Sequence, residues 1–216
     1  MRNAANIPLV TTIKERCRVC FTCVRECPAK AIRIVDGQAE VISERCIGCG
    51  NCVRLCSQQA KCVLDSTAEV EALLAGEGKV AAILAPSFPV EFDDCDYERV
   101  VGMLRALGFD YVTEVAFGAD LVADRYRKLI ESRQDERYVA TTCPSIVAFV
   151  QRYQPDLVDA LAPIVSPMVA MARVLHQRHD SGLKIVFVGP CSAKKGEAAS
   201  SELPDEVHSA LTFAEL

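Results

Sequence analysis

"CRVCFTCVRECP" spans residues 17–28, and "CIGCGNCVRLCS" repeats its pattern at residues 46–57. Each stretch holds four cysteines in the spacing C-x-x-C-x-x-C-x-x-x-C. Three thiolates at two-residue intervals can bind three corners of a 4Fe-4S cube, while the fourth cysteine of the run points towards a second cube. The pattern therefore predicts two 4Fe-4S clusters. The expected ligands are Cys17, Cys20, Cys23 and Cys56 for the first cluster and Cys46, Cys49, Cys52 and Cys27 for the second.

Structural zinc and disulfides are the alternatives for cysteines at this density. Zinc sites use paired C-x-x-C spacing rather than triplets with a trailing cysteine, so the runs favour iron-sulfur clusters. Disulfides between neighbours in so short a loop would be strained. Ser57 stands where Pro28 closes the first run, and this difference affects the exit of the loop rather than the ligation.

The segments that follow the two cysteine runs also resemble each other. "AIRIVDGQAEVI" (residues 31–42) alternates β-formers around Asp36-Gly37, which predicts a hairpin with a type I′ turn. "AKAIRI" (residues 29–34) matches "AKCVLD" (residues 60–65), which places Cys62 at the position of Ala31 as a small buried filler. This internal duplication resembles the bacterial two-cluster ferredoxins over about residues 14–65.

Composition limits the function classes. The chain has 216 residues and a formal net charge of -5, and no basic stripe is visible, which argues against nucleic acid as a partner. The longest apolar run, residues 80–88, is far shorter than the roughly 20 residues of a membrane helix. The first residues lack the apolar region of a signal peptide. We therefore expect a cytoplasmic protein without a membrane span.

Residues 66–216 alternate between strand-like and helical runs, which predicts a mainly parallel sheet. The expected strands are residues 80–85, 111–116, 138–142 and 184–188. The expected helices are residues 97–108, 119–131, 145–153 and 166–179. The fold class expected for the chain is an α+β ferredoxin-like domain followed by an α/β domain. Its expected parts are an N-terminal extension (1–13), the two-cluster domain (14–65), a linking helix (66–77) and the α/β domain (78–216).

Two further cysteines follow expected strands of the second part. Cys143-Pro144 follows residues 138–142, and Cys191 follows residues 184–188. Sites in parallel sheets form at the carboxyl ends of the strands, so both thiols are expected at one edge of one sheet. Lys194 would share the face of Cys191 on a helix. The alternative is that Lys194 and Lys195 form a solvated surface pair.

The motifs "APSF", "LGFDYVTEVAFGADL", "TTCPS", "SPM" and "GPCSAKKGE" resemble, in order and spacing, the catalytic domain of the iron-only (FeFe) hydrogenases over about residues 78–216. In that family a 4Fe-4S cluster bridged to a di-iron unit interconverts protons, electrons and dihydrogen. The resemblance implies that Cys143 and Cys191 are ligands of such a cluster. It also implies that Lys194 faces a cyanide ligand of the di-iron unit.

The sequence departs from the family pattern at several positions. Thr142 stands where active members have the proton-relay cysteine, and a threonine hydroxyl does not titrate near neutral pH. Arg125 and Tyr126 stand where relay glutamates are expected, and Gly189 replaces the methionine before Pro190. The later C-x-x-x-C motif is absent from the 216 residues, so we expect a fragment. A longer chain that supplied that motif would complete the third cluster and its di-iron unit.

These observations leave three hypotheses open. The first is an iron-sulfur protein that carries electrons through two clusters towards a hydrogenase-like site, for dihydrogen interconversion or sensing. The second is a two-cluster electron-transfer subunit whose α/β part is a non-catalytic docking domain, and the third is a relative of the assembly factors with this fold. The expected partner is a redox protein, either ferredoxin-like or an attached signalling module.

Overall fold

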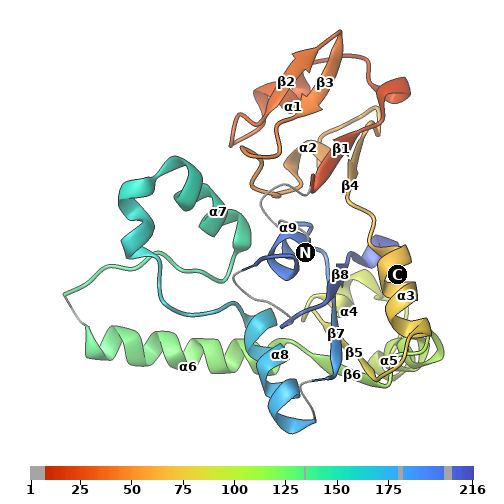
Figure 1. Ribbon diagram of the computed structural model, residues 1–216, viewed down its shortest axis with the longest axis vertical. Helices are drawn as coiled ribbons and strands as arrows, with labels where there is room; N and C mark the ends of the chain where they lie inside the picture. Colours follow the sequence, from red (N-terminus) through yellow and green to blue (C-terminus); the bar gives the residue numbers. More distant parts are fainter. Residues whose placement is uncertain (1–7, 134, 180–181, 202–205) are drawn as a thin grey trace.

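The computed structural model describes residues 8–133, 135–179, 182–201 and 206–216. Two small antiparallel sheets and two short helices form an N-terminal unit (residues 8–65), drawn in red and orange in Figure 1. Its elements are β1 (Val10–Thr12), α1 (Thr22–Arg25), β2 (Ile32–Val35), β3 (Gln38–Val41), α2 (Asn51–Arg54) and β4 (Lys61–Val63), with a 3₁₀ turn at Lys14–Arg16. Strand β1 pairs with β4, and β2 pairs with β3.

The β2–β3 hairpin turns at Asp36 and Gly37, with φ angles of 49° and 70°. Two successive left-handed residues are the requirement of a type I′ turn, so the hairpin prediction is confirmed. Buried side chains from both halves of the unit form one small core around Ala31, Ile32 and Ala39. Cysteines of both runs pack against this core.

A four-stranded parallel sheet in the order β6-β5-β7-β8 forms the centre of the C-terminal unit (residues 66–216). The strands are β5 (Val80–Leu84), β6 (Tyr111–Glu114), β7 (Lys184–Val188) and β8 (Ser209–Leu211). The helices are α3 (Thr67–Ala75), α4 (Phe88–Glu91), α5 (Tyr97–Ala106), α6 (Ala116–Ser132), α7 (Pro144–Tyr153), α8 (Pro167–Arg178) and α9 (Ala193–Ala198), with 3₁₀ turns at Pro155–Ala160 and Phe213–Glu215. The expected mainly parallel α/β fold is therefore present.

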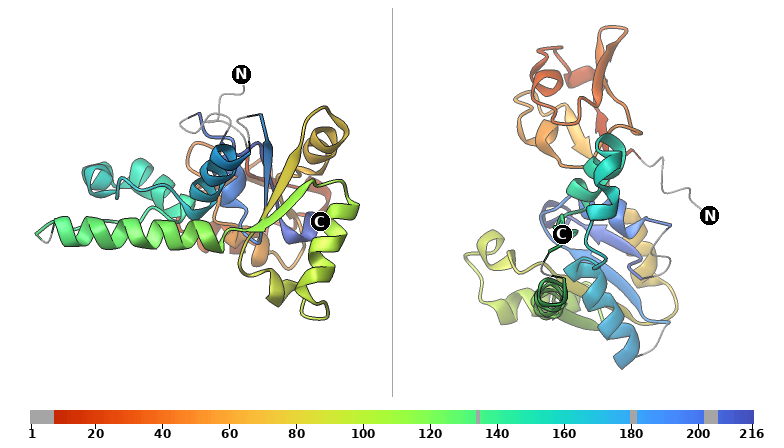
Figure 2. Two further views of the ribbon diagram at one scale, coloured as in Figure 1. Left: turned by 90° about the horizontal axis from the view of Figure 1, so that it is seen from below. Right: turned by 90° about the vertical axis from the view of Figure 1, so that its left-hand side faces the viewer.

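Helices cover both faces of this sheet. Helices α3 and α5 lie on one side and α8 on the other, and α6 extends away from the sheet edge (Figures 1 and 2). Every residue of β5 is buried, as expected for a strand covered on both faces. Helix α6 crosses close to α8 at Gly118, where an added Cβ would lie 2.4 Å from the carbonyl oxygen of Pro167. Within the described residues, no helix is long and apolar enough to cross a membrane.

The prediction of a strand at residues 138–142 is wrong. Val139 makes only an isolated bridge to Leu161, and the place beside β7 is taken by β8, which the sequence pattern does not reveal. The strand expected at residues 111–116 ends earlier, at Glu114, and α6 begins at Ala116, three residues before the expected helix. Cys143 and Cys191 therefore do not follow two strands of the same sheet, and only Cys191 follows a sheet strand.

Candidate metal centres

The two cysteine loops have the same backbone shape. In the second loop Gly48 and Gly50 have left-handed φ angles of 69° and 72°. Val19 and Phe21 occupy the equivalent places in the first loop, with φ angles of 53° and 62°. A non-glycine residue in this region costs on the order of 1–3 kcal/mol and persists only where its surroundings impose it. The two loops thus make left-handed turns at equivalent places between their cysteines.

The electrostatic neighbours of the buried thiols fall into two sets of four. Burial raises the pKa of Cys23, and the nearby Cys20, Cys17 and Cys56 raise it further. Burial likewise raises the pKa of Cys52 to about 11, with additional contributions from Cys46, Cys27 and Cys49. Each set joins the triplet of one run to the fourth cysteine of the other run. These are the same two sets that the spacing predicts for the two clusters.

The donor chemistry of these sets fits iron-sulfur clusters. Backbone N–H groups donate to the sulfurs of Cys27 and Cys56 from Ala31 and Ala60, at 3.3 Å in both cases. Such bonds favour thiolates, whereas crowding of four partly buried thiols disfavours them unless a cationic centre is bound. Across the described ranges, no three Cys, His, Asp or Glu side chains converge as they would around a single metal ion. Sets of four thiols with N–H donors to sulfur are the ligand chemistry that iron-sulfur clusters take.

The two halves of the unit correspond residue by residue when they are aligned on these N–H to sulfur bonds. Ala31 and Ala60 donate in the same way, and Lys30 and Gln59 before them have left-handed φ angles of 46° and 50°. Ala60 rather than Cys62 is therefore the counterpart of Ala31, which corrects the alignment of "AKAIRI" with "AKCVLD". Cys62 is half-buried, not fully buried.

In the C-terminal unit, Cys143 is the residue before α7, which begins at Pro144, one residue before the expected helix. Cys143 and Thr142 are exposed. The preceding Thr141 is fixed by Tyr126 of α6, whose hydroxyl accepts a hydrogen bond from the Thr141 N–H at 2.8 Å. Tyr126, which stands where a relay glutamate is expected, therefore positions the chain before Cys143.

Cys191 is half-buried on the turn between β7 and α9. Lys194 on α9 donates to Glu197 at 2.6 Å, and both side chains are nearly buried. Lys195 is 4% exposed and bonds Glu215 at 2.8 Å. The alternative that the two lysines are a solvated surface pair is therefore wrong. A Cβ at Gly189 would lie 2.6 Å from the Cβ of Ala85, so this tightly packed position excludes the methionine of the family pattern.

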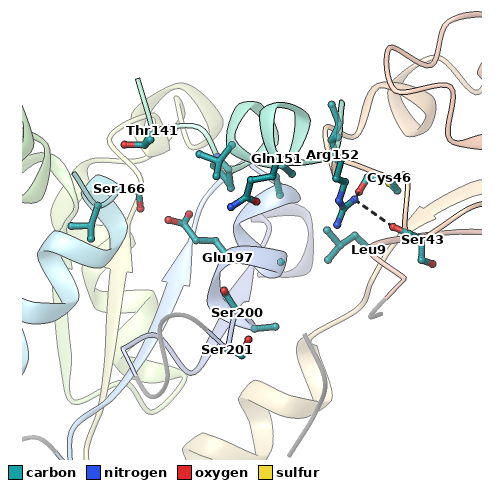
Figure 3. Close-up of a pocket in the computed structure, with 18 of the residues that line it drawn as sticks. Leu9, Ser43, Cys46, Thr141, Gln151, Arg152, Ser166, Glu197, Ser200 and Ser201 are labelled. Atoms are coloured by element: carbon teal, nitrogen blue, oxygen red, sulfur yellow. Dashed lines mark hydrogen bonds between the residues drawn. The ribbon is translucent and has the colours of Figure 1, made fainter. Parts of the chain in front are cut away.

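A cavity of about 470 Å³ lies between the two units. Its wall includes Cys46 from the second cysteine loop, Pro144 and Gln151 from α7, and Glu197 from α9. Figure 3 shows Glu197 pointing into this space and Arg152 reaching towards Ser43 and Cys46. Neighbours of both Cys143 and Cys191 thus line one cavity, although neither thiol is itself part of the wall.

A hydrogen bond and close packing hold the second cysteine loop against the turn at Cys191. The hydroxyl of Ser192 donates to the carbonyl of Gly48 at 2.8 Å. An added Cβ at Gly48 would lie 3.3 Å from Cα of Ala193, and one at Gly50 would lie 3.0 Å from the Ser192 hydroxyl. Glycine at both positions therefore allows the loop to approach α9 closely as well as to turn.

The far end of α7 also holds the N-terminal unit. Tyr153 donates to the carbonyl groups of Ala29 at 2.7 Å and Arg45 at 2.8 Å. Arg152 donates to the carbonyl of Cys46. Arg152 and Tyr153 belong to no motif, and the motif that contains Ser192 does not reveal its partner. The partners of all three residues lie more than 100 residues away along the chain. Sequence reasoning therefore missed them.

Residues 78–216 match the family described as "Iron only hydrogenase large subunit, C-terminal domain". The chain belongs to this family. Residues 9–57 match a family described as "4Fe-4S dicluster domain". With these two matches the protein is an iron-sulfur protein with a hydrogenase-like domain.

Curated relatives include a hydrogenase and an assembly factor. Iron hydrogenase 1 of Clostridium pasteurianum is 32% identical over 146 residues, which cover 59% of this chain and 25% of the relative. Cytosolic Fe-S cluster assembly factor NAR1 of Yarrowia lipolytica is 26% identical over 132 residues, covering 58% of this chain and 27% of the relative. NADP-reducing hydrogenase subunit HndD of Solidesulfovibrio fructosivorans is 29% identical over 121 residues, which cover 48% of this chain and 21% of the relative. The chain spans about a quarter of the length of these relatives.

Cys62 and Cys95 lie outside both sets of four thiols. Cys95 is in the acidic turn "DDCDY", where loss of hydration and a hydrogen bond with Asp94 raise its pKa. Desolvation is the larger of these two causes. The main charged neighbours of Cys95 are Asp94, Arg99 and Asp96 rather than other thiols, so it belongs to neither set of cluster ligands.

Proposed function

We propose that this chain carries electrons through two 4Fe-4S clusters towards a hydrogenase-type site at Cys143 and Cys191. The observation that carries the proposal is the hydrogen bond from Ser192 to the carbonyl of Gly48. It holds the loop of Cys46, Cys49 and Cys52 against the residue that follows Cys191. When bound, such clusters supply one-electron redox chemistry.

The residues of this chain would hold the two centres in series. Residues 17–23 with Cys56 would bind the outer cluster, and residues 46–52 with Cys27 would bind the inner one. Contacts from α7, and from Ser192 just before α9, reach the neighbourhood of the inner set, at Ala29, Arg45, Cys46 and Gly48. This supports an order in which electrons enter at the outer set and leave from the inner set. We propose the corresponding division of the chain into 14–65 and 78–216, joined by residues 66–77.

A second candidate is a non-catalytic docking role for the α/β part. It is favoured by Lys194, whose ammonium group is paired with Glu197 at 2.6 Å instead of being free to face a ligand. Thr142 adds to it, because its hydroxyl cannot exchange protons readily near neutral pH. In that case Cys143 and Cys191 would be retained from a hydrogenase-type site without binding a cluster.

Iron analysis after anaerobic reconstitution with iron and sulfide tests both candidates. Two cubes alone give about 8 iron atoms per chain, and a third cluster at Cys143 and Cys191 gives about 12 or more. We expect at least about 8, with two reduced-cluster signals in EPR. A reconstituted chain with about 4 iron atoms or fewer would contradict the two-cluster proposal. A value near 8 that is unchanged in Cys191→Ala favours the docking role.

The surface around Cys20 suggests where an acidic redox partner would bind. Cys20 is exposed, and the neighbouring Phe21 is 48% exposed. Residues 14–30 contain five basic and two acidic side chains in a protein of net charge -5. The basic ones, all exposed, are Lys14, Arg16, Arg18, Arg25 and Lys30. Complementary charge speeds encounter between partners, so an acidic electron-transfer protein fits this surface.

Reversing two of these charges should slow electron delivery from such a partner. We expect Arg18→Glu/Arg25→Glu to lower the association rate constant of a reduced acidic plant-type ferredoxin about tenfold or more at low ionic strength. The difference should disappear near 1 M salt, where the Debye length is about 3 Å. Stopped-flow absorbance of the donor measures both rates.

The matched control is Arg105→Glu/Arg178→Glu, which reverses two exposed charges of the C-terminal unit. It should leave the ferredoxin rate nearly unchanged. The cationic radical of methyl viologen should not be slowed by either double variant. Equal slowing by both double variants would show an effect of total charge and contradict docking at the Cys20 loop.

A further inference from the structure

Lys61 is a charged side chain buried inside the N-terminal unit. It begins β4, lies opposite Thr12 of β1, and is 4% exposed. Its ammonium group donates to the Thr12 hydroxyl at 2.5 Å and to the Ala39 carbonyl at 3.3 Å. In the described part of the chain, no carboxylate forms an ion pair with it. A buried lysine without a counter-ion ordinarily costs several kcal/mol, on the order of the penalty for one desolvated ion.

The position of Lys61 in the internal repeat makes its charge unexpected. Ala31 and Ala60 are equivalent, since each donates its N–H to the sulfur of the cysteine four residues before it. The next residue is Ile32 in the first half and Lys61 in the second. Ile32 is 7% exposed and belongs to the small core. In the first half this position is therefore filled by a buried apolar side chain, whereas in the second half it is filled by a buried cation.

The surroundings of the ammonium group point to its counter-ion. Ala39, whose carbonyl it bonds, belongs to the core against which Cys17, Cys23, Cys46 and Cys52 pack. Cys17 and Cys23 belong to one thiol set, and Cys46 and Cys52 belong to the other. Lys61 thus lies beside a core that thiols of both sets share.

We propose that Lys61 is a shared counter-cation of both clusters and raises the reduction potential of each by stabilising its reduced form. A cube held by four thiolates is an anion, and reduction adds a further negative charge. A fixed cation in a poorly hydrated site therefore favours the reduced state. The proposal rests on the proposed function, because it requires that two clusters are bound.

Two neutral variants test it by EPR-monitored potentiometric titration of the reconstituted chain. Lys61→Met removes the charge and keeps the shape, and Lys61→Gln keeps a hydrogen-bond donor. The Thr12 hydroxyl itself donates to the Ala39 carbonyl at 2.5 Å, so that bond survives both changes. We expect both clusters to become harder to reduce. A tenfold smaller equilibrium constant, the size expected, lowers a one-electron potential by about 59 mV.

Lys30→Met is the matched control, because it removes an exposed lysine of the same unit that donates to the Arg25 carbonyl. It should shift neither potential by a comparable amount. Both potentials unchanged in the two neutral variants, or a shift of one cluster alone, would overturn the proposal. A shift as large in Lys30→Met would overturn it too. Wild-type protein that binds about 4 iron atoms or fewer would instead refute the proposed function.

Discussion

Replacing Cys52 with alanine is expected to abolish the inner cluster and to leave the outer one in place. Iron content should fall from about 8 to about 4 atoms per chain, and one of the two reduced-cluster EPR signals should disappear. The physical reason is that Cys52 is one of the four thiols of the inner set, and the methyl group of alanine cannot bind iron. Electron flow to the α/β part should stop, because the remaining cluster is the one away from Ser192.

Cys62→Ala is the control for this experiment, since Cys62 is a half-buried thiol in the same unit and lies outside both sets. Its iron content should stay near the wild-type value. Cys27→Ala should remove the same EPR signal as Cys52→Ala, although Cys27 belongs to the first cysteine run. If Cys27→Ala instead removed the signal that Cys23→Ala removes, the crossed assignment of ligands would be wrong.

The N-terminal unit could be predicted from sequence to a large extent, because its determinants are local. The hairpin depends on Asp36 and Gly37, which accept left-handed conformations, and the loops depend on cysteine spacing. Local pattern also predicts α7 and α8, which begin at Pro144 and Pro167 after Cys143 and Ser166. The sequence alignment of the two halves was wrong because the shared letters "AK" pair Ala29 with Ala60. The hydrogen bonds to sulfur show that Ala31, two residues later, is the true counterpart of Ala60.

The sheet of the C-terminal unit was only partly predictable, because strand pairing is a tertiary property. Residues 138–142 have β-forming side chains, yet Val139 finds only Leu161 as a partner. The sheet position beside β7 goes to Ser209–Leu211, three residues without an alternating pattern. Propensity for strands depends on available neighbours, and only the fold supplies them.

The candidate site, like the sheet, was only partly predictable from the sequence. Cys143, Cys191 and Lys194 are visible from motifs, but the pairing of Lys194 with Glu197 and the contact of Ser192 with Gly48 need the folded structure. Lys61 also needs the folded structure, because lysine is ordinarily a surface residue and this one is buried. Sequence therefore predicts candidate ligands better than the charges that surround them.

The largest stability effect is expected at Lys195, whose ammonium group joins three parts of the C-terminal unit. It donates to the Ser66 hydroxyl at 2.8 Å, the Ala210 carbonyl at 2.9 Å and Glu215 at 2.8 Å. These partners lie before α3, in β8 and in the last 3₁₀ turn. Lys195→Met leaves the half-buried Glu215 carboxylate without its cation. Breaking such a pair costs about 3–5 kcal/mol in the free energy of unfolding.

The dependence on pH identifies the carboxylate as the cause. Burial raises the pKa of Glu215, but hydrogen bonds from Lys195, Thr212 and Ser66 outweigh burial and the pKa is lowered overall. In the wild type this group stabilises the fold above its unfolded pKa of about 4.3, and the contribution is lost as pH falls through the folded value. A protonated Glu215 has no charge to compensate. The deficit of Lys195→Met should therefore shrink as pH falls towards 4.

Urea unfolding of the cluster-loaded chain, followed by far-UV circular dichroism at several pH values, measures these differences. Lys195→Met/Glu215→Gln should regain part of the loss at pH 7, because it removes the uncompensated charge as well as the cation. Lys79→Met changes an exposed lysine that contacts the Tyr111 hydroxyl and should stay within about 0.5 kcal/mol of wild type. A deficit in Lys195→Met that neither depends on pH nor responds to Glu215→Gln would mean that Lys195 acts through packing. In that case the ion pair would not be what fastens α9, and with it the turn at Cys191, to the rest of the unit.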